Sequence, residues 1–368
     1  MFDIALGVFL FLSPIFVLLG NNARLNGIFG ALQFHQFKSI SLESSIIQLQ
    51  FFEYAIAGLF IVALANNQRR NFKDLNFSLL FGACALSVIF HPKTLSSFPV
   101  IFLGFLLYYL VVKYANRVKR LFYVIAIVSI LNTVFAFLQF FNNPISRIDG
   151  LMGLSSHLGT YQALAFPVCY SIHPLLSIIP LIGVFLSGSA TSLIALSIGV
   201  IYMFYHKKEK IFINLAPMGL TAILGIAIVL ISRNYAQVFS KFLLRLELWG
   251  EVLKQILRHP FIGYGLNSFP SLSHQIFSRL GYCEWIYNEY LNVAFCLGVF
   301  ALIPVYGFLK DKFNNVGLGI NRYIAASCLI ASIICIAQPS LNFARLAGTI
   351  IPLFAFLEIL KRKENLKC

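Results

Sequence analysis

The sequence predicts an all-α, polytopic integral membrane protein. Of the 368 residues, 59% are hydrophobic and 11% are charged, and the mean hydropathy is +0.83. A soluble domain cannot bury that much apolar surface, so lipid is the expected solvent. Apolar runs of roughly 20 residues, the length that crosses a bilayer, recur from end to end with short polar breaks. We therefore expect one transmembrane domain over residues 1–368 and no separate soluble domain.

Hydropathy predicts about twelve transmembrane helices. The first apolar run is followed by Asn21-Asn22-Ala23-Arg24 rather than by a small-residue cleavage site, so we expect a retained helix and not a removed signal peptide. The expected spans lie near 4–20, 46–65, 75–91, 96–113, 121–141, 156–172, 174–187, 189–205, 212–231, 285–309, 321–338 and 346–360.

Positive charges predict the orientation of these helices. More than half of the 28 Lys and Arg residues fall in alternate connections and in the C-terminal tail. By the positive-inside rule these segments face the cytoplasm, as do both termini, so we expect a multi-pass membrane protein with cytoplasmic termini. The same bias accounts for most of the net charge of +15, so no nucleic-acid partner is expected. The basic segments are 69–73, 113–120, 207–210, 310–322 and 361–367.

Residues 232–284 form the single long loop, and this topology places it on the outer, periplasmic side. From about 236 to 257 apolar residues recur at helical spacing, with charged residues mostly on the other side, which predicts an amphipathic helix. His259-Pro260 should end it, because proline disfavours helical geometry in the preceding residue. A second short amphipathic helix is expected around 269–280. The apolar stripe consists of Phe239, Phe242, Leu243, Leu246, Trp249, Leu253, Ile256 and Leu257.

The outer loop also carries cations where the positive-inside rule predicts few. Arg245, Arg258 and Arg279 are among them. Cations kept on this side indicate an anionic partner. Phospholipid headgroups would satisfy that requirement, since an amphipathic helix can simply lie in the membrane interface. A specific phosphate-bearing substrate would satisfy it too, because arginine offers a planar, permanently charged fork of donors.

Four stretches occur in a shared order across the central and C-terminal parts of the chain. They are RIDGLMGLSSHLGTYQALAFPV at 147–168, SGSATSLIALSIG at 187–199, RLELWGEVLKQILRHPFIGYGLNSF at 245–269 and WIYNEYLNVAFCLGVFAL at 285–302. Together with the long outer loop they resemble the O-antigen ligase/polymerase superfamily. Members are membrane glycosyltransferases that act on undecaprenyl-diphosphate-linked glycans at the outer face of the bacterial inner membrane.

Two departures bear on the activity that this resemblance implies. Ligases of the superfamily typically carry His where this chain has Tyr287, and often carry Arg in the Ser-rich turn where it has Ala190. Both departures favour a polymerase of lipid-linked oligosaccharide repeat units over a ligase that transfers the glycan to lipid A-core or protein. The implied partners are the undecaprenyl-diphosphate-linked donor, a glycan acceptor and the bilayer, with a chain-length regulator as a further candidate.

The chemistry of glycosyl transfer from a diphosphate selects the candidate site residues. Negative charge builds on the leaving diphosphate, and no Asp-x-Asp pair or Cys/His cluster is present to hold a metal, so we expect arginines to stabilise it and expect no cofactor. The acceptor hydroxyl needs a base near the outer membrane face. The candidate catalytic residues are Arg245, Glu289 and Tyr287, and the candidate diphosphate- and glycan-binding residues are Arg147, Arg258, His259, His157, Asn288 and Arg279.

Structural roles compete with these chemical ones. Glu289 could cap the helix that it begins, His259 could be a surface residue at a helix end, and His157 could cap or pack. Other function classes also remain open at this point. A flippase or transporter of the same glycans would place charged residues at mid-bilayer along several helices and show repeated halves. In a non-catalytic assembly or adhesion protein, the outer loop would be only a docking surface.

Overall fold

The computed structural model describes residues 1–15, 55–65, 74–142, 148–204, 235–276, 285–314, 316, 319–342 and 344–365. Every regular element within these ranges is a helix, which confirms the predicted all-α fold. The predicted spans near 46–65 and 212–231 lie partly or wholly outside the described residues.

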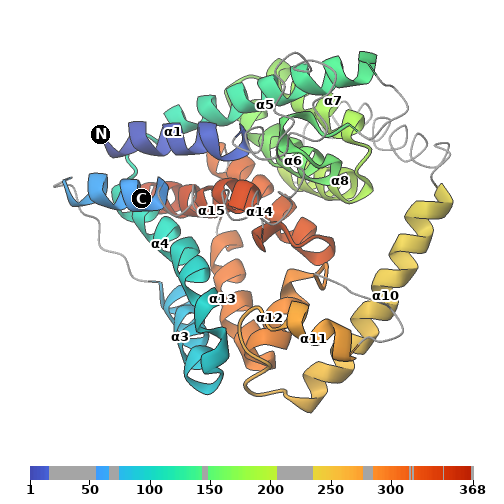
Figure 1. Cartoon of the computed structure of the whole chain (residues 1–368). Coiled ribbons are helices and arrows are strands. Elements are labelled where there is room, and N and C mark those ends of the chain that lie inside the picture. Colours follow the sequence, from blue (N-terminus) through green and yellow to red (C-terminus); the bar gives the residue numbers. More distant parts are fainter. Residues whose placement is uncertain are drawn as a thin grey trace, which may run out of the picture.

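The helices form two packed groups, which meet where α12 contacts α14, α3 contacts α4 and α13 contacts α15 (Figure 1). The first group consists of α1 (Phe2–Ile15), α4 (Phe98–Tyr114), α5 (Val118–Asn142), α6 (Ser155–Ile172), α7 (Ile178–Ser187), α8 (Ala190–Phe204), α14 (Ile320–Ala337) and α15 (Ala344–Asn365). The second group consists of α3 (Leu75–Phe90), α10 (Tyr235–Arg258), α11 (Phe269–Ile276), α12 (Glu289–Leu297) and α13 (Leu302–Phe313).

Helix α6 lies at the centre of the first group and is buried along almost its whole length. Small and polar residues on it, including Thr160, Gln162 and Ala163, let α5, α7, α8 and α14 approach closely. Gln162 donates to Ser129 O on α5 at 3.0 Å and accepts from Ser129 Oγ at 2.5 Å. Polar pairs of this kind satisfy groups that neither lipid nor a hydrocarbon core can satisfy.

The second group has a smaller core of its own. Val252 and Ile256 of α10 pack with Phe269 of α11 and Phe295 of α12. The indole Nε1 of Trp249 donates to the backbone oxygen of Ile286 at 2.8 Å, which fixes α10 against the start of α12. The buried face of α10 therefore differs from the predicted stripe: Phe242, Leu243, Leu246, Leu253 and Leu257 are exposed.

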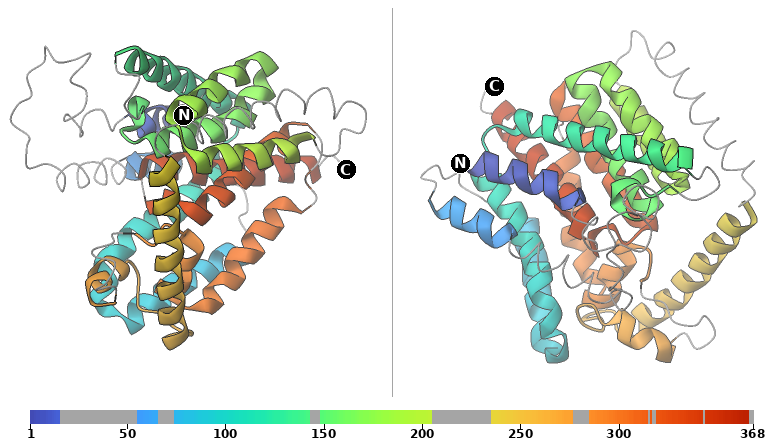
Figure 2. Two further views of the ribbon diagram at one scale, coloured as in Figure 1. Left: turned by 90° about the vertical axis from the view of Figure 1, so that its right-hand side faces the viewer. Right: turned by 45° about the horizontal axis from the view of Figure 1, so that its top comes forward.

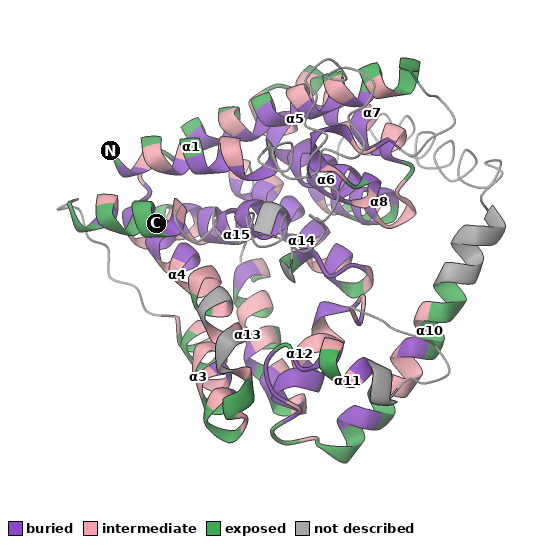
Figure 3. Ribbon diagram, in the orientation of Figure 1, coloured by how far each residue is buried: buried purple, intermediate pink, exposed green. Residues whose placement is uncertain are grey.

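Large apolar side chains cover the outside of several helices. On α5 the exposed ones include Ile127, Val134 and Phe141, and α3 and α8 show the same pattern (Figure 3). By length and composition, α5 and α14 could each cross a bilayer, and six shorter helices are also apolar. The expected number of about twelve spans stays a prediction.

The span expected near 285–309 is a broken helix. Helix α12 ends at Leu297, a 3₁₀ turn covers Val299–Ala301, and α13 begins at Leu302. Gly298, with φ of +87°, makes the break. Likewise α7 has only ten residues, about 15 Å of helix, so the span expected near 174–187 is shorter than the hydrocarbon core.

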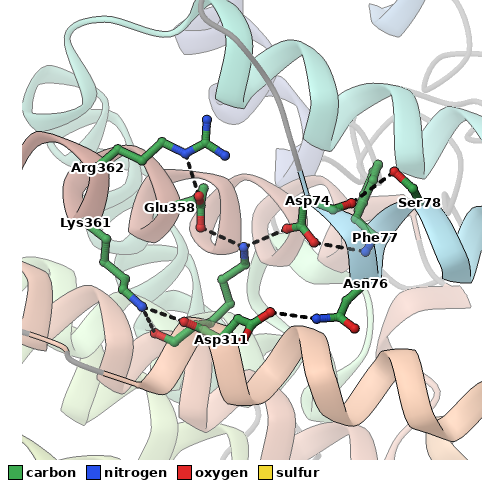
Figure 4. A network of polar contacts seen from close by, with 9 residues as sticks. Asp74, Asn76, Phe77, Ser78, Asp311, Glu358, Lys361 and Arg362 are labelled. Carbon is green, nitrogen blue, oxygen red and sulfur yellow. Dashed lines mark hydrogen bonds and ion pairs between the residues drawn. The ribbon is translucent and has the colours of Figure 1, made fainter. Parts of the chain in front are cut away.

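Polar contacts join three helix ends, which the charge pattern predicted to lie at the cytoplasmic face. Lys312 Nζ of α13 donates to Asp74 Oδ2 before α3 at 3.0 Å and to Glu358 Oε2 of α15 at 2.8 Å (Figure 4). Arg362 Nε donates to Glu358 Oε1 at 2.6 Å. Lys312 is 1% exposed, so this ion-pair network is a buried link between the two helix groups.

Helix α10 lies on the side of the molecule away from the N-terminus and from the end of α15 (Figures 1 and 2). In Figure 1 it runs steeply across the direction of α5. The candidate site forms where α10 approaches α12 and α14.

Candidate functional site

The connection between α14 and α15 is the centre of the site. Pro339 forces the preceding Gln338 into an extended conformation, with φ of −144° and ψ of 143°, so α14 ends at Ala337. The last carbonyl groups of a helix have no intrahelical partner and carry the negative end of the helix dipole. A 3₁₀ turn over Ser340–Asn342 then leads into α15. Contacts from α6, α10 and α12 converge on these few residues.

Arg245 of α10 uses one of these terminal carbonyl groups. Its Nη1 donates to Ala337 O at 3.1 Å, and its guanidinium carbon lies 4.7 Å from the ring centre of Tyr287. The side chain is half-buried, and burial lowers the pKa of Arg245, with the Tyr287 hydroxyl opposing part of that shift. Within the described part of the chain, no carboxylate forms an ion pair with it. The charge is held in place but is not neutralised.

Tyr287 has an unusual backbone conformation. Its φ is +57°, in the left-handed region that residues other than Gly, Asn and Asp rarely adopt. Asn288 follows as the N-cap of α12, and its Oδ1 accepts from Leu291 N at 3.0 Å. The turn places the Tyr287 ring beneath the guanidinium of Arg245. The side-chain oxygen of Asn288, predicted to bind substrate, is used as a helix cap.

Glu289 is the first residue of α12 and is 7% exposed. Its Oε1 accepts from the backbone nitrogen of Leu341 at 2.8 Å. The N-terminal end of a helix favours a carboxylate through its unpaired N–H groups. Arg245 and Glu289 thus contact opposite ends of the same short connection, Ala337 and Leu341. The structure brings together all three predicted catalytic residues.

Two residues at this site were not predicted from the sequence. Thr160 Oγ1 of α6 donates to Gln338 Oε1 at 3.0 Å, and both side chains are buried. His157, a predicted substrate-binding residue, lies one turn before Thr160 at the start of α6 and is 4% exposed. Residues three apart share one face of a helix, so His157 approaches the site from the same side as Thr160. A lone amide directly before a proline, between two apolar runs, is the pattern that could have revealed Gln338.

Arg258 and His259 lie at the far end of α10. Thirteen residues of helix separate Arg245 from Arg258, which corresponds to about 20 Å. Arg258 Nη1 donates to Gln255 Oε1 at 3.3 Å, and the His259 ring contacts the Tyr264 ring at 4.5 Å. Both residues are exposed, and the structure does not bring them to Arg245. Arg147 and Arg279 lie outside the described residues.

The His-Pro-x-x-Gly-x-Gly turn after α10 docks on the end of α12. Tyr264 N donates to Phe295 O at 2.9 Å, Gly265 N to Cys296 O at 3.0 Å, and Val299 N to Pro260 O at 2.8 Å. Gly263 has φ of +68°, and a Cβ there would lie 2.5 Å from Phe295 O. Only glycine allows this close backbone approach. The motif therefore holds α10 at a fixed position relative to α12.

Part of the chain is similar to a known protein family. Residues 175–306 match the model of the O-antigen ligase family. The matched region contains the Ser-rich turn, the Arg245 helix, the glycine turn and the start of α12, but not α6 or the α14–α15 connection. No curated protein matches the chain. The family match confirms the resemblance predicted from the motifs: residues 175–306 of this chain are similar to the O-antigen ligase family.

Proposed function

We propose that this protein is a metal-independent membrane glycosyltransferase that polymerises undecaprenyl-diphosphate-linked oligosaccharide repeat units at the outer face of the bacterial inner membrane. The family match supports an O-antigen ligase or polymerase type of activity. The observation that carries the proposal is Arg245, a half-buried cation without a described ion-pair partner, held at one end of the α14–α15 connection while the buried carboxylate of Glu289 contacts the other end.

In the proposed reaction, an acceptor hydroxyl oxygen attacks the anomeric carbon of the donor sugar. A bond forms between that oxygen and the anomeric carbon, and the bond from the anomeric carbon to the diphosphate oxygen breaks. Polyprenyl diphosphate leaves with the electron pair of the broken bond. The hydroxyl proton passes to Glu289, which acts as the general base.

Arg245 stabilises the leaving diphosphate. A guanidinium has five N–H donors, and the contact with Ala337 O uses one of them. The others can form charge-assisted hydrogen bonds to phosphate oxygens, which gain negative charge as the glycosidic bond breaks. The Ala337 carbonyl and the Tyr287 ring hold the guanidinium in place before the substrate binds, so little reorganisation of the site accompanies the reaction.

The proposed topology has about twelve spans and cytoplasmic termini. The charge pattern supports it, and so does the position of the ion-pair network around Lys312 at the ends of α13 and α15. The site residues belong to the opposite ends of the helices: Glu289 begins α12, and Ala337 ends α14. A lipid-linked donor in the outer leaflet would present its diphosphate at that depth.

Reconstitution of the purified protein with a defined polyprenyl-diphosphate oligosaccharide tests the proposal. A polymerase given this donor alone should produce a ladder of lengthening glycans. Glu289→Gln keeps an oxygen that can accept from Leu341 N but removes the base, so we expect it to lower the rate of elongation by about 10²–10⁴-fold. In a second reaction that also contains lipid A-core, single transfers to that acceptor without a ladder would instead show a ligase. Movement of intact donor across the bilayer would show a transporter, and either result contradicts the proposal.

A further inference from the structure

The contact between Thr160 and Gln338 involves the residue that directly follows Ala337, whose carbonyl accepts from Arg245. Thr160 is 0% exposed and Gln338 is 7% exposed, and their side chains meet through the hydrogen bond from Thr160 Oγ1 to Gln338 Oε1 at 3.0 Å. This bond joins α6 to the residue that ends α14. Breaking it would leave a buried amide oxygen without this donor.

The peptide unit between Ala337 and Gln338 connects this contact to Arg245. The carbonyl of Ala337 and the nitrogen of Gln338 belong to one planar peptide group, so the orientation of one fixes the other. Gln338 N donates to Ile334 O at 2.9 Å, and the side chain of the same residue is held by Thr160. Ala337 O therefore points in a fixed direction, toward Nη1 of Arg245 at 3.1 Å.

We propose that Gln338, held by Thr160, is a positioning residue of the glycosyltransferase site. The proposal rests on the function proposed above. Gln338 orients the Ala337 carbonyl, the carbonyl orients the Arg245 guanidinium, and the guanidinium binds the diphosphate. The contact of Glu289 lies further along the same connection, at Leu341 N, and the proposal concerns Arg245 alone.

A second buried hydrogen bond between the same two helices provides a matched control. Ser327 Oγ of α14 donates to Leu164 O of α6 at 2.9 Å, and Ser327 is 0% exposed. Eleven residues of α14 separate it from Gln338, which corresponds to about 16 Å. Loss of this bond removes a buried α6–α14 contact but leaves the Ala337 carbonyl where it is. If Thr160 had only a structural role, loss of its hydrogen bond to Gln338 and loss of the Ser327 hydrogen bond to Leu164 should lower the activity equally.

The test compares steady-state elongation by full-length Thr160→Val, Thr160→Ser and Ser327→Ala enzymes. Thr160→Val removes the hydroxyl and keeps the shape of the side chain, and we expect kcat to fall by about 10- to 100-fold through misplacement of Arg245. Thr160→Ser retains the hydroxyl and should recover most of that loss. Ser327→Ala should change kcat by less than about threefold. An equal fall in Thr160→Val and Ser327→Ala would overturn the proposal.

The double variant Thr160→Val, Arg245→Ala distinguishes an effect of Thr160 on the position of Arg245 from a general disruption of the fold. If Thr160 acts through Arg245, adding Thr160→Val to Arg245→Ala should cause no further fall in the single-turnover rate, whereas independent effects would multiply. Multiplied effects therefore contradict the positioning role. Gln338→Met, which removes the acceptor oxygen, repeats the comparison from the other partner in case Thr160→Val does not fold.

The same variants distinguish failure of this proposal from failure of the proposed function. A wild-type rate in Arg245→Ala would refute the function itself. A strongly reduced rate in Arg245→Ala together with a wild-type rate in Thr160→Val would refute only the positioning role.

Discussion

At the residue scale, Arg245 shows how a helix end can hold a cation without neutralising it. A carboxylate partner would cancel the charge that a diphosphate needs. A carbonyl at a helix C-terminus attracts the guanidinium through its partial negative charge and leaves the formal charge intact. Ala337 O supplies this contact, and the face of the Tyr287 ring adds a second attraction.

Tyr287→Asn tests the contribution of the ring to the position of Arg245. Asn tolerates the left-handed φ of +57° better than most residues, so the backbone before α12 should be preserved while the ring is lost. The cation–π contact is worth about 0.5–2 kcal/mol, so we expect kcat/KM for the lipid-linked donor to fall by about 2- to 30-fold. Tyr287→Phe keeps a ring face and should lose less. A larger loss in Tyr287→Phe than in Tyr287→Asn would contradict this role for the ring.

The sequence predicted the charged residues of the site better than the neutral ones. Arg245 was recognisable as a cation kept in the outer loop, where the positive-inside rule predicts few. Glu289 was recognisable because a charge at the outer end of a predicted span is costly. Thr160 and Gln338 carry no charge and lie at the edges of apolar runs, where hydropathy does not distinguish them. The role of Asn288 as a helix cap could not be predicted, because it depends on a backbone φ of −152° that the residue type alone does not determine.

At the scale of single elements, the sequence predicted the extent of α10 but not the face that packs on α12. The expected range of about 236–257 compares with Tyr235–Arg258 in the structure, because the proline after His259 ends the helix as the stereochemistry requires. The helix has apolar residues on more than one face, so periodicity could not tell which face packs on α12. Leu248, Val252 and Ile256 do so, and Phe242 and Leu246 point outward.

Gly263→Ala tests whether the glycine turn holds α10 in place. The substitution puts a Cβ 2.5 Å from Phe295 O at a φ of +68°, and such strain costs about 1–3 kcal/mol. We expect the turn to shift and to displace α10, which lowers the thermal stability and the rate of elongation together. Gly250→Ala is the control, because a Cβ at that position on α10 meets nothing within 4 Å. Equal activity of the two variants would show that the turn does not position the helix.

At the scale of the whole molecule, the two helix groups are joined near both ends. The proposed site bridges them through Arg245 and the α14–α15 connection, and the ion-pair network bridges them through Lys312. The proposed topology puts these two links at opposite ends of the helices, so we expect the network to have a structural role and not a chemical one. Its expected role is to hold α3 and α13 against α15. Because α12 precedes α13 in the chain, this link also fixes the position of α12 relative to α14.

Lys312→Met tests this link. The change leaves the Asp74 and Glu358 carboxylates without their shared cation, and breaking a buried ion pair in this way typically costs about 3–5 kcal/mol. We expect a clear fall in the unfolding temperature of the detergent-solubilised protein. The triple variant Lys312→Met, Asp74→Asn, Glu358→Gln removes both charges as well and should regain part of the loss. Lys310→Met, at an exposed position of the same helix, should have little effect, and a fall as large as that of Lys312→Met would contradict the account.

Composition was sufficient to predict the class of the molecule but not its internal breaks. The proportion of apolar residues predicts helices in a membrane whatever their exact course. Hydropathy cannot detect the interruption at Gly298, since apolar residues continue on both sides of it. The break arises from backbone pairing with a turn more than thirty residues earlier in the chain, and a local pattern contains no information on such pairing.

The most direct test of the central claim is the rate at which Arg245→Ala releases polyprenyl diphosphate from a defined lipid-linked donor. Lys254→Ala is the matched control, because Lys254 is an exposed cation of the same helix, paired with Glu251 at 2.6 Å. The account predicts a fall of about 10²–10³-fold in kcat for Arg245→Ala, as for loss of a key transition-state donor, and little change for Lys254→Ala. Equal rates for the two variants would contradict it and would leave the cations of α10 as contacts for lipid headgroups.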